Sequence, residues 1–285
     1  MCLTLSNVSL SCPLDFIQIT VSGKCNDSVA LPLYFSQVLE VSETDLLLII
    51  DNVATYRVQN GSHIQINPFP NADLSAIQLF LNGSAFGAAL HQRGIIPFHG
   101  CSFELNQKGI VLCGYSGAGK SSVTAAFCQQ GARFINDDIT PVIIDESGIW
   151  IMPIRTRIKL WEDALAALAI ESENLEKIRP STQKFYVPVE NNCQDKLQLN
   201  TLIVLGIHDN DQNDQYELMR PVGMEKFNLL RSHIYRKIYL KGMPKAERNL
   251  FSQLLKLSQS VEVLHILRPQ KSSIHATMEF IRGQL

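Results

Sequence analysis

The eight residues GYSGAGKS, Gly114 to Ser121, constrain the fold of this chain more than any other stretch. They match the pattern G-x-x-x-x-G-K-[S/T] at every fixed position, which happens by chance in a chain of this length in roughly one sequence in a hundred. The apolar run GIVLC comes directly before them, and SSVTAAFCQQG follows and ends at Gly131. This order predicts a β-strand, a glycine turn and then a helix.

A loop of this kind can cradle phosphate groups. Its glycines let the backbone turn N–H groups inward, and the following helix adds partial positive charge at its N-terminus. Lys120 is then predicted to bridge the β- and γ-phosphates of ATP, and the Ser121 hydroxyl to ligate Mg²⁺. The alternative is a glycine-rich turn with an exposed lysine. The candidate ATP-binding residues are Gly114, Tyr115, Ser116, Gly117, Ala118, Gly119, Lys120, Ser121 and Ser122.

Two adjacent aspartates, Asp137 and Asp138, end the next apolar run, RFINDD. Ligands of open α/β sheets gather at the carboxyl ends of strands, where this pair is expected. Side chains alternate along a strand, so the two carboxylates point in different directions unless the chain is already turning. One can then hold Mg²⁺ with Ser121 while the other meets the hydroxyl of the acceptor. The alternative use of the pair is a turn or a helix cap.

His99 precedes the loop, and a single histidine beside a glycine is more often structural than catalytic. Taken in order, however, His99-Gly100, the Gly114–Ser121 loop and Asp137-Asp138 resemble the catalytic domain of the HPr serine kinase/phosphorylase family. That family has an HG or HA pair, a GxSGxGKS loop and a DD pair. The wider chain, with NGSAFGAALHQRG before His99 and MPIRTRIKLWEDAL after the aspartates, is similar to stand-alone HPr kinase-like proteins, including lasso-peptide tailoring kinases.

The resemblance implies a P-loop kinase core whose central sheet is similar to that of phosphoenolpyruvate carboxykinase. It also implies that His99 lies near the transferred phosphate and that the aspartate pair supplies the general base and a contact to Mg²⁺. Asp138 is the preferred base because the family's proton-accepting aspartate aligns there, but the two roles can be exchanged. The implied catalytic residues are Asp138, Asp137, Lys120 and His99, and the implied metal ligands are Ser121, Asp137 and Asp138.

The chain departs from the family after the aspartates. The second glycine-rich signature of the HPr enzymes, with its glutamate, has no equivalent, and PIRTRIKLWED stands there with Arg155, Arg157 and Lys159 at alternate positions. On a strand these cations share a face, where they can neutralise transition-state charge or hold an anionic acceptor. A solvated basic edge strand is the alternative. The departure argues against phosphorylase activity and against HPr as the acceptor, and it makes Arg155 and Arg157 candidate phosphate or acceptor contacts.

Hydrophobic patterning predicts an α/β protein with a small β-rich N-terminal domain. We expect the β-rich domain over 1–70 with a hairpin turn at QNGS, a buried connecting helix over 71–94 that begins at Asn71 or Asp73, and the catalytic domain over 95–285. In the last part, strands are expected at 94–98, 102–105, 109–113, 133–137, 141–145, 148–152, 185–189, 199–208 and 261–267, and helices over about 120–130, 161–177, 223–240, 245–259 and 272–285.

The composition of the chain argues against some classes of function. The 25 basic and 27 acidic residues nearly balance, so the chain lacks the electrostatic signature of a nucleic-acid partner. Its 7 cysteines are scattered without metal-ligand spacing, as is usual for reduced thiols in the cytoplasm. No apolar run approaches the roughly 20 residues of a membrane helix, and the N-terminus lacks the pattern of a signal peptide, so no membrane partner is expected.

The sequence therefore predicts a cytoplasmic ATP-dependent kinase that uses Mg²⁺ and phosphorylates a hydroxyl, a serine of a peptide or small protein. One alternative is an ATP-binding regulatory partner protein without transferase activity. Another is a small-molecule kinase of the same fold. The family resemblance also implies a homo-oligomer.

Overall fold

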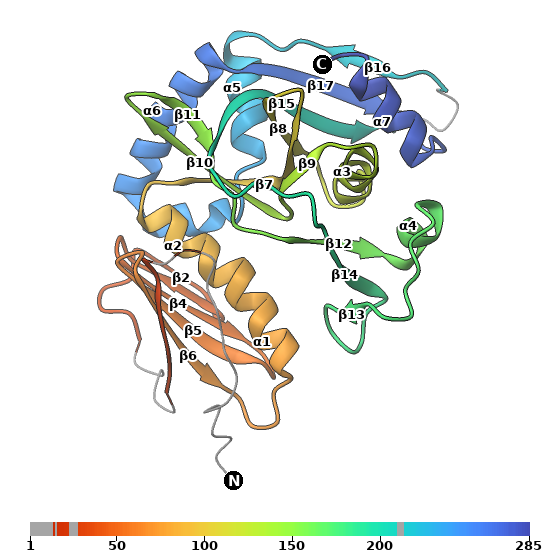
Figure 1. The fold of residues 1–285 in the computed structure, drawn as a ribbon. Coiled ribbons are helices and arrows are strands. Elements are labelled where there is room, and N and C mark those ends of the chain that lie inside the picture. The colour runs from red at the N-terminus through yellow and green to blue at the C-terminus, as the bar shows by residue number, and fades with distance from the viewer. Residues whose placement is uncertain (1–13, 15, 23–27, 210–213) are drawn as a thin grey trace. The chain divides into compact units, whose positions relative to one another are not determined.

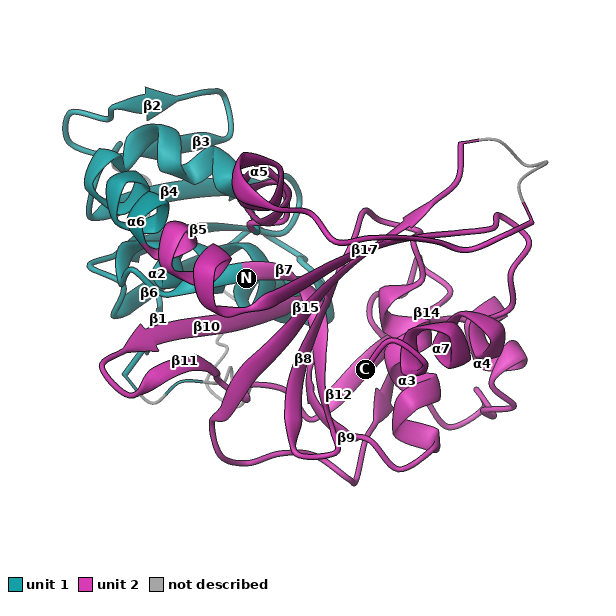
Figure 2. Ribbon diagram, turned by 90° about the horizontal axis from the view of Figure 1, so that it is seen from above, with its two compact units in different colours: residues 1–97, 235–252 teal, residues 98–234, 253–285 magenta. Residues whose placement is uncertain are grey.

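The structure is a computed structural model that describes residues 14, 16–22, 28–209 and 214–285. The chain divides into two compact units, one of residues 1–97 and 235–252 and the other of residues 98–234 and 253–285 (Figure 2). This partition differs from the expected boundaries at 70 and 94. The helical segment expected over 71–94 belongs to the first unit, and so do residues 235–252. The mixed α/β class with a β-rich first unit is confirmed.

The first unit is built on a six-stranded sheet in the order β1-β6-β5-β4-β3-β2 (Figure 1). Its strands are β1 (Gln18–Val21), β2 (Tyr34–Phe35), β3 (Leu39–Val41), β4 (Asp45–Ile50), β5 (Ala54–Gln59) and β6 (His63–Pro68). β1 runs parallel to β6, and the other neighbours pair antiparallel. The expected hairpin turn is confirmed between β5 and β6, where Asn60 and Gly61 both have positive φ.

One helical segment packs on this sheet. It consists of α1 (Leu74–Phe80), the π-helical turn η1 (Leu81–Ala85) and α2 (Phe86–Gln92), and the Asp73 carboxylate caps it by accepting from the Ala76 N–H at 2.9 Å. The buried Tyr56 hydroxyl on β5 donates to the Ile77 carbonyl at 2.9 Å, which ties the sheet to the helix. The segment is buried along most of its length, as its apolar faces predict.

Residues 235–252 complete the first unit. They contain η2 (Lys237–Gly242), a 3₁₀-helical turn, and the first half of α6 (Pro244–Ser260). η2 approaches β3 closely, because a Cβ at Gly242 would lie 2.5 Å from the Val41 carbonyl oxygen. The predicted helix over 245–259 is therefore confirmed as α6, but its first half packs with the β-rich unit.

The second unit is built on an eight-stranded sheet with β8, β15 and β17 parallel at its centre. The order is β11-β10-β7-β8-β15-β17-β16, and β9 also pairs with β7. The strands are β7 (Ile96–Leu105), β8 (Lys108–Cys113), β9 (Arg133–Asn136), β10 (Ile139–Asp145), β11 (Gly148–Ile151), β15 (Leu197–Ile207), β16 (Glu217–Met219) and β17 (Glu262–Arg268).

β7 replaces the two strands expected at 94–98 and 102–105. The chain stays extended through His99 and Gly100 because Gly100 pairs directly with Cys113 of β8. A Cβ at Gly100 would lie 2.7 Å from the Leu112 carbonyl oxygen, so the close approach of the two strands requires glycine here. His99 is thus a residue of a regular strand.

Two helices, α3 (Lys120–Gln129) and α7 (Ile274–Arg282), pack against each other in the second unit. A smaller three-stranded sheet, β12 (Arg157–Trp161), β14 (Lys184–Pro188) and β13 (Glu176–Lys177), contributes Ile158, Leu160 and Phe185 to the same hydrophobic core. These elements surround the loop that follows β8 (Figure 1).

Two expected helices are shorter than predicted, and the prediction over their second halves is wrong. The helix expected at 161–177 is α4 (Glu162–Ala167), which stops before Ala169 takes a positive φ of 53°, and residues 176–177 pair with β14 instead. The helix expected at 223–240 is α5 (Gly223–Ser232). It ends because the His233 carbonyl accepts from the His99 N–H of β7 at 2.7 Å, a tertiary contact that local sequence does not encode.

The described cysteines Cys101, Cys113, Cys128 and Cys193 are free thiols, and Cys2, Cys12 and Cys25 lie outside the described residues. Within the part of the chain that the structure describes, no helix has the length and apolar character needed to cross a membrane.

Candidate active site

The loop from Gly114 to Ser121 joins β8 to α3, as predicted. Gly114, Gly117 and Gly119 have φ angles of 150°, 86° and 102°, a region that other residues rarely adopt. Gly114 has a second constraint, since a Cβ there would lie 2.3 Å from the Leu205 carbonyl oxygen of β15. The buried Lys120 folds back over the loop, and its Nζ donates to the Gly114 carbonyl at 2.8 Å and the Tyr115 carbonyl at 3.1 Å.

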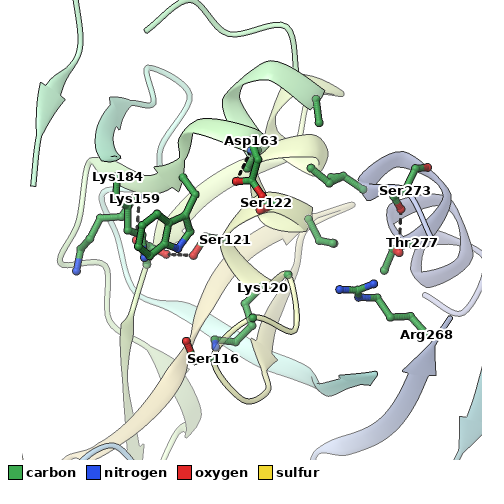
Figure 3. A pocket seen from close by; sticks show the side chains of 18 of the residues that line it. Ser116, Lys120, Ser121, Ser122, Lys159, Asp163, Lys184, Arg268, Ser273 and Thr277 are labelled. Carbon is green, nitrogen blue, oxygen red and sulfur yellow. Dashed lines mark hydrogen bonds between the residues drawn. The ribbon is translucent and has the colours of Figure 1, made fainter. Parts of the chain in front are cut away.

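A cavity of about 560 Å³ opens in front of this loop. Figure 3 shows Ser116 and Lys120 at one end, Lys159 and Lys184 on one side, and Arg268, Ser273 and Thr277 on the other. Of the predicted site residues, the cavity is lined by His99, Ser116, Gly117, Gly119, Lys120, Ser121, Ser122, Asp137 and Asp138. Residues predicted from three separate motifs therefore share one cavity.

The buried Asp137 carboxylate meets the end of the loop. Its Oδ1 accepts from the Ser121 hydroxyl at 2.8 Å and lies 3.1 Å from the Cys101 thiol, while its Oδ2 accepts from the Lys159 backbone N–H at 2.9 Å. Burial first, then the nearby Asp137 charge, raises the pKa of Cys101 well above its usual value, so Cys101 stays a neutral thiol. Ser121 and Asp137 thus place two oxygens of the kind that Mg²⁺ prefers next to each other.

The neighbouring Asp138 points elsewhere, because its φ of 73° turns the chain at this residue. Its Oδ2 forms an ion pair with Lys159 Nζ at 2.7 Å, and its Oδ1 lies 3.6 Å from His99 Nδ1. Burial alone would raise the pKa of Asp138, but the Lys159 ammonium and its hydrogen bond, followed by His99, hold the pKa below its usual range. Asp138 is therefore a carboxylate at neutral pH.

His99 lies on β7 with its ring toward Asp138, and its Nδ1 is 3.2 Å from the Asp138 carbonyl oxygen. Burial and then the Lys120 charge lower the pKa of His99, and the two aspartates oppose this only in part. The imidazole is therefore neutral at pH 7. Lys159 shows the opposite balance: burial lowers its pKa, but the charges of Asp138 and Asp137 and the hydrogen bond to Asp138 together outweigh burial, and the net pKa is raised.

The three cations at alternate positions, Arg155, Arg157 and Lys159, do not share one environment. Arg157 pairs with Glu176 at 2.6 Å and stacks over the Tyr186 ring at 4.1 Å, and neither Arg155 nor Arg157 lines the cavity. The cation that enters the cavity is Lys159. Arg157 differs from Lys159 because it pairs with Glu176 of β13, and this strand could not be located from sequence.

Sequence reasoning missed the far walls of the cavity. Trp161 and Lys184 come from paired positions of β12 and β14. Arg268 ends β17, Ser272 and Ser273 lie in the loop after it, and Thr277 lies in α7. The Arg268 Nε donates to the Ala118 carbonyl of the glycine loop at 3.0 Å, across 150 residues of sequence. No local motif marks these residues, and only strand pairing brings them to the loop.

Ser121 and Asp137 are residues of the cavity that could hold a Mg²⁺ ion. The described residues contain no group of three or more His, Cys, Asp or Glu side chains arranged to hold a metal ion by themselves. Mg²⁺ commonly uses one or two protein oxygens and takes its remaining ligands from phosphates and water, which is what Ser121 and Asp137 offer.

The chain is similar to known proteins at the level of three-dimensional structure. No family model and no curated protein matches the chain. Among solved structures, the HPr(Ser) kinase/phosphatase from Coxiella burnetii matches with a TM-score of 0.33 and 10% sequence identity, over 66% of this chain and 89% of that chain.

Proposed function

We propose that this protein is an ATP-dependent kinase that uses Mg²⁺ to transfer the γ-phosphate to a hydroxyl group, a serine of a peptide or small protein. The observation that carries the proposal is the hydrogen bond of 2.8 Å between the Ser121 hydroxyl, at the end of the glycine loop, and the buried Asp137 carboxylate. A phosphate-binding loop alone serves binding, whereas a carboxylate beside its serine adds the second protein ligand that phosphoryl transfer needs for Mg²⁺.

In the proposed reaction, the glycine loop binds ATP, the phosphate donor. Backbone N–H groups of the loop and the N-terminus of α3 face the phosphates, and Lys120 exchanges its contacts with loop carbonyls for contacts with the β- and γ-phosphates. Ser121 and Asp137 hold Mg²⁺, which supplies charge neutralisation at the transferred group.

Asp138 is the general base that acts on the acceptor hydroxyl. It accepts the proton of the acceptor hydroxyl as the hydroxyl oxygen forms its bond to the γ-phosphorus and the bond to the ADP oxygen breaks. The Lys159 ion pair keeps Asp138 ionised in the free protein. Lys159 lines the same cavity; a turn of its ammonium group toward the transferring phosphate would raise the proton affinity of Asp138 during the reaction. The serine specificity of the acceptor rests on the motif resemblance described above.

The test is transfer of label from γ-labelled ATP to a panel of serine peptides, with ATP binding measured in parallel. The wild-type protein should show Mg²⁺-dependent transfer, and Lys120→Ala should lower it by roughly a thousandfold or more. Lys177→Ala, a change at an exposed lysine outside the cavity, is the matched control and should retain transfer. ATP binding without transfer or hydrolysis would instead support a regulatory nucleotide-binding protein.

A further inference from the structure

One surface that borders the cavity has, apart from Lys159, no part in the chemistry described so far. It is the face of the small sheet formed by Arg157, Lys159 and Trp161 of β12 together with Lys184 and Tyr186 of β14, which we call the β12–β14 face. Direct strand partners lie on the same side of a sheet, and here Lys159 pairs with Tyr186 and Trp161 with Lys184. The opposite side of the same strands is buried in the core, so this face is the one left to bind something.

The end of this face nearest the cavity has the character of a binding surface. The Trp161 side chain is 53% exposed, although tryptophan is normally well buried. Lys184 Nζ lies 5.5 Å from the Trp161 ring, and both residues line the cavity. Exposed aromatic side chains beside a cation are common where a protein binds a peptide or another protein.

Geometry assigns this side of the cavity to the acceptor. The general base must lie within hydrogen-bond reach of the acceptor hydroxyl, and Asp138 is bound to Lys159 on the β12–β14 face. In-line transfer places the leaving ADP on the opposite side of the γ-phosphate. The wall with Arg268 and Thr277 is then left for the rest of the nucleotide.

The charges on this side favour an anion. The positive charges of Lys159 and Lys184 both lower the pKa of Asp138, and both side chains line the cavity. Among the nearby carboxylates, Glu176 is paired with Arg157, whereas Asp163 lines the cavity and keeps its negative charge. Lys159 is paired with Asp138, but Lys184 forms no ion pair with any residue that the structure describes, so its ammonium group is left to bind an anion.

We propose that the acceptor is a peptide that carries an acidic side chain close to the phosphorylated hydroxyl, with this carboxylate bound by Lys184 and the adjoining part of the peptide packed on Trp161. The inference rests on the kinase function proposed above and adds a class of substrate to it. Recognition of this kind needs no nucleotide, because the face is complete in the free protein.

The test compares matched peptides on the intact protein without nucleotide. Each pair is acetylated and amidated at its ends and differs only in Glu or Gln one to three residues from the serine. Binding is followed by fluorescence in a Trp150→Phe background, where Trp161 is the remaining tryptophan of the two in the chain. We expect the Glu peptide of at least one pair to bind about tenfold more tightly and to change the Trp161 emission. Equal affinity within every pair would overturn the proposal.

Charge-reversal variants locate the effect. Lys184→Glu should remove or invert the preference for Glu over Gln. Lys177→Glu makes the same change in net charge on the same small sheet, but Lys177 pairs with the core-facing Phe185 and so lies on the other side. It should leave the preference unchanged, and an equal loss in both variants would contradict the assignment to the β12–β14 face. The comparison of peptide pairs on the Trp150→Phe protein does not depend on the folding of either charge-reversal variant.

The outcomes separate this inference from the proposed function. Preference for Glu peptides without phosphoryl transfer to any of them would contradict the kinase function and with it the role of the peptide as an acceptor. Transfer that is equally efficient to Glu and Gln peptides would contradict the present inference and leave the kinase function standing.

Discussion

At the scale of single residues, the two adjacent aspartates have different environments and therefore different chemistry. Asp137 is buried and hydrogen-bonded to Ser121, whereas Asp138 is partly exposed, with 31% of its side chain accessible, and paired with Lys159. Because Asp138 has a positive φ, the Asp137 and Asp138 carboxylates point in different directions. Sequence alone left the two roles exchangeable, and this difference in contacts favours Asp137 for the metal and Asp138 for the proton.

Substitution of each aspartate tests this division. Asp138→Asn should lower kcat by roughly 100- to 10,000-fold with little change in Mg²⁺-dependent ATP binding, because it removes a base and leaves the loop intact. Asp137→Asn should weaken the apparent Mg²⁺ affinity by roughly 10- to 100-fold. Steady-state kinetics with a Mg²⁺ titration separate the two. The opposite pattern would show that the roles are exchanged.

His91 gives a prediction for stability against pH. It is buried in α2, with Nε2 2.8 Å from the Tyr235 carbonyl oxygen, and burial lowers its pKa from 6.5 to about 4. As the pH falls below 6.5, the unfolded chain takes up a proton that the folded chain refuses, so the free energy of unfolding falls until the pH reaches about 4. Between pH 7.5 and 5, His91 should account for a loss of about 2 kcal/mol.

Urea denaturation at several pH values measures this loss. His91→Gln has no titrating group at this position and should flatten the dependence by that amount, while the smaller slopes due to His99 and His265, whose pKa values burial also lowers, remain. An unchanged slope in the His91 variant would contradict the account.

At the scale of elements, the part of the fold that sequence predicted best is the strand, loop and helix around Gly114. There the constraints are local: an apolar run, glycines with positive φ and a helix start within one short stretch. The helices expected at 161–177 and 223–240 failed because distant strands decide where they end. For the same reason, sequence found the loop and the aspartates of the site but neither Lys184 nor Arg268, which arrive from β14 and β17.

The loop itself can be tested with two glycines. Gly114→Ala combines positive φ with a clash against the Leu205 carbonyl and should cost about 2 to 4 kcal/mol of stability and abolish ATP binding. Gly131→Ala has a φ of 95° but open space around it, so it should cost only about 1 to 2 kcal/mol and retain ATP binding. Chemical denaturation and equilibrium ATP binding give both values. Equal effects of the two substitutions would contradict the proposed close approach of the loop to β15.

At the scale of the whole molecule, the boundaries of the units are discontinuous in sequence. The first unit needs residues 235–252 as well as the N-terminal sheet, so it is not a module that begins at residue 1 and stops at residue 70. Composition and patterning could identify a β-rich N-terminal part, because its strands are local. They could not assign η2 to it, since that depends on a close contact between Gly242 and Val41.

Deletion of residues 1–70 tests this organisation. It removes the whole six-stranded sheet and leaves the apolar faces of α1, α2 and η2 without their partner. We expect the shortened chain to bind a hydrophobic dye and to unfold at a clearly lower temperature, since each large side chain exposed costs about 1.5 to 3 kcal/mol. Calorimetry and dye fluorescence follow this. A monomeric product with an unchanged unfolding temperature would contradict the assignment of 71–97 and 235–252 to the first unit.

The hydrogen bond from Arg268 to the Ala118 carbonyl has a consequence for the order of folding. The strands on which the glycine loop rests, β8, β15 and β17, are parallel neighbours that lie far apart in the sequence. During synthesis the loop leaves the ribosome long before β17 and α7 exist. Since non-local parallel pairing forms slowly, the glycine loop acquires its final wall only after β17 and α7 have been synthesised, and a nascent chain released before that point would carry the motif without the cavity.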